Sequence, residues 1–216
     1  MRQDHDDAHA DTDSDRESTE KWYERKSAFM ASRLGPQHDT VMHALIPFAL
    51  GGGLDLYYYP NGIPGTCIST KELCEIPGEG PSNRVFSCYE LVMFTRVPLA
   101  LDDAKNPATP FGRIHAIIND VLNPIAQYCG SSVILNPCES CEFPADMDGV
   151  GGMCLLFDGY GCWPDKEAGE FGLMLLMAIH RSELEFIQKN GSERLLERLK
   201  GAGVYPYSDL DRPPVA

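Results

Sequence analysis

Long apolar runs are missing from this sequence of 216 residues. A membrane-spanning helix needs roughly 18 consecutive apolar residues, and no run here approaches that length. The first residues also lack the charged and then apolar segments of a secretory leader. We therefore expect a cytoplasmic protein that does not act at a membrane.

Basic residues are few, since 18 Lys and Arg stand against 32 Asp and Glu, for a formal net charge of -14. An acidic surface repels nucleic acid and suits a basic protein partner. Residues 1–20 alone hold eight acidic residues against two Arg. We predict that residues 1–17 form a disordered acidic tail and that residues 18–216 form one domain, for which 43% hydrophobic residues provide a core.

Familiar catalytic motifs are also missing. The sequence has no Gly-x-Ser-x-Gly elbow, no HExxH pair and no dinucleotide-binding glycine pattern. The glycines at 51–53 invite a phosphate-loop interpretation, but no Gly-Lys-Ser or Gly-Lys-Thr follows them. His43, His115 and His180 have no acidic or cysteine neighbour at ligand spacing. These patterns favour a protein without catalysis and without a cofactor.

The eight cysteines include a single CxxC pair, Cys138 and Cys141. A structural zinc site normally needs four ligands with paired spacings, and the glutamates beside this pair disfavour a reactive thiolate. We expect no bound metal. The alternative is a metal-dependent or hydrolase-like enzyme that uses Cys138, Cys141 and the acidic loop with Asp146 and Asp148.

The segment 171–179 is apolar in both of its alternating sets of side chains. Phe171, Leu173, Leu175, Met177 and Ile179 form one set, and Gly172, Met174, Leu176 and Ala178 form the other. Such a pattern predicts a central strand that is covered on both faces.

Two short helices are predicted after this strand. Ser182 and Glu185 have the spacing of a capping box, and Asn190-Gly191 ends the first helix. Ser192 begins the second helix, whose apolar stripe precedes Gly201.

Helices and strands are also predicted in the first two thirds of the chain. A helix begins near Ser18 and ends at Gly35-Pro36, and a strongly amphipathic helix begins at Thr109-Pro110 and ends at Cys129-Gly130. The strands are expected at 54–59, 85–96, 133–135 and 153–157. Within the second strand, Glu90 shares a side with apolar residues. We expect it to be paired with an Arg, capped by backbone donors or placed at the open edge of the sheet, rather than to act as a base.

Four stretches resemble the suppressor of fused-like domain family. They are LDLYYYP at 54–60, YELVMFTR at 89–96, FGLMLLMAIHRSELEFIQKNGSERLLERL at 171–199 and SDLDRPPV at 208–215. Their order and spacing match the family, and the resemblance covers roughly residues 40–216. It implies an α+β fold with a mixed β-sheet and packed helices.

The resemblance also implies a non-catalytic function. Members of this family look like proteins that sequester a partner, and bacterial single-domain members resemble immunity proteins that neutralise a toxin. The chain is similar in length to the bacterial kind. We therefore expect a protein-binding domain whose partner is a basic toxin or an extended peptide.

An extended peptide would pair with a sheet edge, where backbone N–H and C=O groups are unpaired. The best candidate edge in the sequence is the short β-branched stretch 133–136, which contains Val133, Ile134 and Asn136. A negative rim for a basic partner would come from Glu139, Glu142, Asp146 and Asp148.

Overall fold

The computed structural model describes residues 7–131, 133–165 and 169–216. Its helices are α1 (Asp7–Leu34), α2 (Pro110–Gly130), α3 (Arg181–Asn190) and α4 (Ser192–Gly201), with short 3-10 turns η1 (Phe48–Leu50) and η2 (Leu101–Asp103). Its strands are β1 (Val41–Met42), β2 (Leu56–Tyr59), β3 (Thr66–Ser69), β4 (Cys88–Thr95), β5 (Ser140–Glu142), β6 (Cys154–Asp165) and β7 (Gly169–Ile179). No helix in these described ranges is long and apolar enough to cross a membrane.

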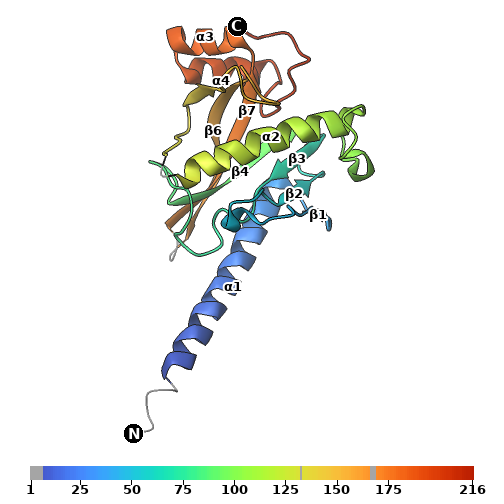
Figure 1. Cartoon of the computed structure of the whole chain (residues 1–216). Coiled ribbons are helices and arrows are strands. Elements are labelled where there is room, and N and C mark those ends of the chain that lie inside the picture. The colour runs from blue at the N-terminus through green and yellow to red at the C-terminus, as the bar shows by residue number, and fades with distance from the viewer. Residues whose placement is uncertain (1–6, 132, 166–168) are drawn as a thin grey trace.

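The strands form one mixed sheet in the order β1-β2-β3-β4-β7-β6-β5. Only β4 and β7 are parallel neighbours in this sheet, and the other neighbouring pairs are antiparallel. The helices pack on the two faces of the sheet (Figure 1). The prediction of an α+β fold with a mixed sheet is therefore confirmed.

Strand β7 lies between β4 and β6 and is buried on both faces, as its sequence predicts. Leu175 faces the cluster that contains α1, α3 and α4, whereas Leu176 faces the cluster that contains α2. Both side chains have no exposed surface. Gly172 permits this packing, because a Cβ atom there would lie 2.3 Å from the ring of Phe86.

Helix α1 buries Trp22, Lys26, Met30 and Leu34, which recur every fourth residue along one face. The helix begins at Asp7, eleven residues before the Ser18 start expected from the sequence. Its N-terminal half points away from the body in Figure 1. Residues 1–6 of the predicted tail lie outside the described residues.

Helix α2 agrees closely with its predicted bounds. Thr109 is the N-cap, and its Oγ1 accepts a hydrogen bond of 3.1 Å from the backbone N–H of Gly112. The buried stripe of α2 includes Ile118, Val121, Leu122 and Ile125. The opposite side of α2 remains partly exposed and forms the floor of a surface trough.

The start of α3 differs from the capping box predicted at Ser182 and Glu185. The N-cap is His180, and the carboxylate of Glu183 accepts a hydrogen bond of 2.8 Å from the His180 N–H. Glu183 is buried because Arg212, in the C-terminal segment, donates two hydrogen bonds to it. The predicted end at Gly191 and the helix that begins at Ser192 are both confirmed.

Candidate functional site

The predicted edge strand at 133–136 is wrong. These residues pair with no strand in the described chain, and Leu135 instead turns inward into the α2-side core. Pro137 and a positive φ of 68° at Cys138 then reverse the chain. The strand at this edge of the sheet is β5, which begins at Ser140.

Strand β5 pairs with β6 on one side only. The Glu139 carbonyl and the Phe143 N–H bond inward to Phe157 and Met153, at 2.9 Å each. Because the backbone alternates along an antiparallel strand, the N–H and C=O groups of Ser140 and Glu142 point outward, away from β6. The β5 edge therefore offers backbone groups that an added strand could pair with.

The predicted acidic rim is only partly available beside this edge. Glu139 accepts hydrogen bonds of 2.9 Å from the backbone N–H and the side-chain amide of Asn136. Glu142 forms an ion pair with Arg181 at the start of α3. Asp146 and Asp148 are exposed on the following loop, so they are the acidic residues that remain for a partner.

Val133 and Ile134 lie away from the β5 edge. They line a hollow of about 580 Å³ together with Phe48 and the end of α2 at Cys129 and Gly130. The side chain of Ile134 is 59% exposed. The structure thus distributes the predicted site residues over separate surfaces instead of gathering them in one site.

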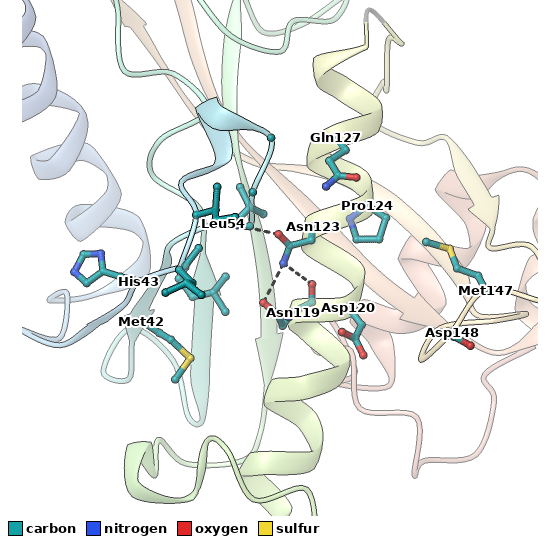
Figure 2. A pocket seen from close by; sticks show the side chains of 17 residues that line it. Met42, His43, Leu54, Asn119, Asp120, Asn123, Pro124, Gln127, Met147 and Asp148 are labelled. Atoms are coloured by element: carbon teal, nitrogen blue, oxygen red, sulfur yellow. Dashed lines mark hydrogen bonds between the residues drawn. The ribbon is translucent and has the colours of Figure 1, made fainter.

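A surface trough of about 760 Å³ crosses the exposed side of α2 (Figure 2). One wall comes from the segment 42–56, which is the loop between β1 and β2 with the strand residue at each end, and the other contains Met147 and Asp148. The floor is formed by the α2 residues Asn119, Asp120, Asn123, Pro124 and Gln127. We call this surface the α2 trough.

Asn123 fixes the floor of the α2 trough to its first wall. Its Oδ1 accepts a hydrogen bond of 2.8 Å from the backbone N–H of Leu54, and its Nδ2 donates to Asn119 at 3.0 Å. These bonds are drawn in Figure 2. The bond between Leu54 and Asn123 joins residues 69 positions apart in the chain, so a tertiary contact holds the wall against α2.

The glycines at 51–53 shape this wall and do not form a phosphate loop. Their N–H groups donate inward to the carbonyls of Phe48, Pro47 and Ile46, at 2.9 to 3.1 Å, so they cannot cradle a phosphate. Gly52 is required by close packing, since a Cβ atom there would lie 1.9 Å from the Ile46 carbonyl oxygen. The loop closes tightly, and Leu45, Ile46 and Leu50 on it remain exposed.

Three large apolar side chains on this loop are exposed to solvent. Leu45 is 100% exposed, Leu50 is 77% exposed and Ile46 is 55% exposed. Adjacent exposed apolar side chains of this kind mark surfaces that bind a partner. This patch was not predictable from composition, because residues 41–50 have the apolar content of an ordinary buried segment.

His43 is not isolated, contrary to the expectation from its sequence neighbours. Its Nδ1 contacts the carboxylate of Asp55, twelve residues away across the loop. Asp55 also accepts a hydrogen bond of 2.8 Å from the backbone N–H of Ala44. Asp55 therefore joins the two ends of the loop that forms this wall of the trough.

The cysteine pair gains no support as a metal or catalytic site. Burial and then the carboxylates of Asp158 and Glu193 raise the pKa of the Cys138 thiol, and burial raises the pKa of Cys141 to about 11. These raised pKa values disfavour a thiolate nucleophile at either cysteine. Within the described residues, no group of three or more His, Cys, Asp or Glu side chains could hold a metal ion.

This chain is similar in fold to proteins of known structure. No protein-family model matches the sequence, and no curated protein matches it significantly. A structure described as "the Sufu-Fu complex crystal structure" matches with a TM-score of 0.60 and 17% identity, over 92% of this chain and 92% of that one. Suppressor of Fused from Drosophila matches with a TM-score of 0.49 and 18% identity, over 72% of this chain and 41% of that one. The chain has a suppressor of fused-like fold.

Proposed function

We propose that this protein is a non-catalytic domain that binds and sequesters a partner protein. The likeness in fold to a chain of the Sufu-Fu complex supports a protein-binding function. The raised thiol pKa values of Cys138 and Cys141 argue against a thiolate nucleophile at this pair. Among the described residues, no group of three or more His, Cys, Asp or Glu side chains could hold a metal ion there.

The observation that carries this proposal is the open β5 edge. Ser140 and Glu142 direct backbone groups outward, and a partner segment in an extended conformation would satisfy them as an added strand. Asp146 and Asp148 lie on the adjoining loop and would favour a basic segment. Glu139 and Glu142 are already occupied by internal contacts, so they are not assigned to the partner.

The finer form of the proposal is that the partner is a basic toxin and the chain is its immunity protein, acting in the cytoplasm. The formal charge of -14 supports a basic partner, because opposite charge speeds encounter and selects against acidic proteins. A protein of this kind would neutralise the toxin by occupying its surface.

The test of the proposed edge compares two variants at one position. Ser140→Pro removes the outward N–H and places a ring where a partner strand would pair, and it leaves the inward bonds to β6 intact. Ser140→Ala keeps the N–H and is the matched control. With the natural partner, captured on the tagged full chain, we expect Ser140→Pro to weaken binding and Ser140→Ala to preserve it.

Equal affinities of the two variants, with both folded to the wild-type melting temperature, would contradict strand addition at β5. The immunity proposal has its own test, which is co-expression with the captured partner. Growth that the partner arrests should be restored by the wild-type chain, and a partner that never arrests growth would rule out a toxin.

A further inference from the structure

The α2 trough is a second surface, on the exposed side of α2, and the proposed function does not use it. It combines an apolar wall, a floor of amide side chains and two carboxylates. We infer that the α2 trough binds a basic segment of a partner protein, in which aliphatic side chains stand next to lysine or arginine. The inference rests on the proposed function only in that the ligand is a protein.

The apolar part of the trough argues for aliphatic anchors in the ligand. Leu45 and Ile46 line the trough and are exposed to water, on a loop whose residues 50–53 donate backbone hydrogen bonds to residues 46–48. Met42 and Met147 lie on opposite walls, and flexible thioether side chains adapt to the shape of an inserted aliphatic group. A ligand that covers these apolar side chains removes them from water, and this favours binding.

The charged part of the trough argues for a basic ligand. Asp120 lies on the floor and Asp148 on the wall, and the described residues that line the trough include no Lys or Arg. Within the described part of the chain, neither carboxylate has a cationic partner. Gly149, with a φ of 77°, brings the loop so close that a Cβ atom there would lie 2.5 Å from Asp120 Oδ2.

In Figure 2, Asp120 projects from α2 toward the segment that carries Met147 and Asp148, and the loop wall with Met42 and Leu54 lies on the other side of α2. A cation that reaches the two carboxylates would place the neighbouring part of its segment over Asn119, Asn123 and Gln127, whose amides can bond its backbone. An anionic membrane surface carries the wrong sign for this site. A basic amphipathic segment satisfies the apolar wall and the carboxylates together.

The experiment uses the full chain and a labelled synthetic peptide of leucine and lysine, followed by fluorescence anisotropy over a salt series. A peptide in which the leucines are replaced by serine has the same charge and is the control ligand. We expect the leucine-lysine peptide to bind more tightly than the serine-lysine peptide. Equal binding of the two peptides would overturn the inference, because charge alone would then explain it.

Variants locate the binding on the surface. Leu45→Ser with Ile46→Ser should weaken binding by about tenfold, and Asp120→Asn with Asp148→Asn should weaken it and flatten its salt dependence. The matched controls are Ile76→Ser, an exposed apolar residue away from the trough, and Glu193→Gln with Glu197→Gln, two exposed carboxylates on α4. An equal loss in the controls would overturn the inference.

Two further measurements separate this inference from its rivals. The Ser140→Pro variant should bind the leucine-lysine peptide as wild type does. Peptide binding at the trough and partner binding at the β5 edge can therefore be tested independently, and either proposal can be wrong while the other holds. Sedimentation of the unliganded chain should give a monomer. A dimer that Leu45→Ser with Ile46→Ser dissociates would show that a second copy occupies the trough, and the inference would then be wrong.

Discussion

Lys26 Nζ lies 3.0 Å from Glu90 Oε1, with both side chains fully buried between α1 and the sheet. Glu90 also accepts hydrogen bonds from Thr70 Oγ1 and from the backbone N–H groups of Leu73 and Cys74. Lys26 donates to the carbonyls of Lys71 and Cys74, at 2.7 Å each. The carboxylate that stood out among apolar residues in the sequence is thus a fully satisfied structural group, and it fixes α1 to the body.

Removing one partner of this pair should destabilise the fold strongly. We predict that Lys26→Met lowers the free energy of unfolding by about 3–5 kcal/mol, because it leaves the Glu90 carboxylate buried without a counter-charge. Urea denaturation measures this change. Lys21→Met, at an exposed ion pair on the same helix, is the control and should change stability little.

A double-mutant cycle tests whether the two residues act together. We expect the double variant Lys26→Met with Glu90→Gln to lose less free energy of unfolding than the two single variants lose together. Each single change leaves a buried charge without its partner, whereas the double change removes both charges. Additive losses would mean that the two side chains stabilise the fold independently.

The pair of Glu183 and Arg212 should give the protein a specific loss of stability in acid. Burial raises the pKa of Glu183, but hydrogen bonds from Arg212 and from two backbone N–H groups outweigh it and hold the pKa below its usual value. The folded-state pKa is therefore below the unfolded value of 4.5. The stability that follows is fully present above pH 4.5 and is lost as the pH falls through the folded-state pKa.

The measurement for this pair is the free energy of unfolding from about pH 6 to about pH 3. We predict that Glu183→Gln lowers stability at pH 6 and loses less further stability in acid than wild type does. Glu185→Gln, an exposed neighbour on α3, should follow the wild-type curve. A Glu183→Gln curve parallel to wild type would mean that this carboxylate does not titrate on unfolding.

The two faces of β7 should be similarly sensitive to truncation. We predict that Leu175→Ala and Leu176→Ala each cost about 2–5 kcal/mol, because both side chains are fully buried in separate core clusters. Thermal and urea unfolding measure the loss. A cost near zero for either variant would contradict burial on that face.

Removing residues 1–17 should leave the melting temperature nearly unchanged. Among the α1 side chains whose burial is described, which begin at Glu17, the first buried one is Trp22, after the deleted segment. Trp22→Ala is the positive control and should lower the melting temperature clearly. A drop of many degrees on deletion would show that the acidic segment stabilises the body.

Elements whose burial follows from the hydrophobic pattern of their own residues were predictable. Strand β7 has apolar residues in both alternating sets, which only a two-sided burial explains. Helix α2 combines a helical apolar period with the Thr109-Pro110 start signal, and both were confirmed. These patterns are local, so tertiary context did not alter them.

Features decided by distant residues were not predictable. Ser182 and Glu185 fit a capping box as well as any pair, but Arg212, 29 residues beyond Glu183, makes Glu183 the carboxylate that turns inward. The stretch 133–136 has the composition of a strand, yet the edge strand begins at Ser140, after the turn at Cys138, where it pairs with Leu155 and Leu156. The α2 trough forms where the segment 42–56, α2 and the loop with Met147 and Asp148 lie together. No residue spacing in the sequence predicts this tertiary arrangement.

The most direct test of the proposed function is amide hydrogen exchange of the full chain, with and without its captured partner. Strand addition at β5 predicts that the Ser140 and Glu142 amides exchange quickly in the free protein, since they point outward, and slow down in the complex. Ser140 and Glu142 amides that exchange at the same rate in the complex, while amides elsewhere become protected, would contradict the account.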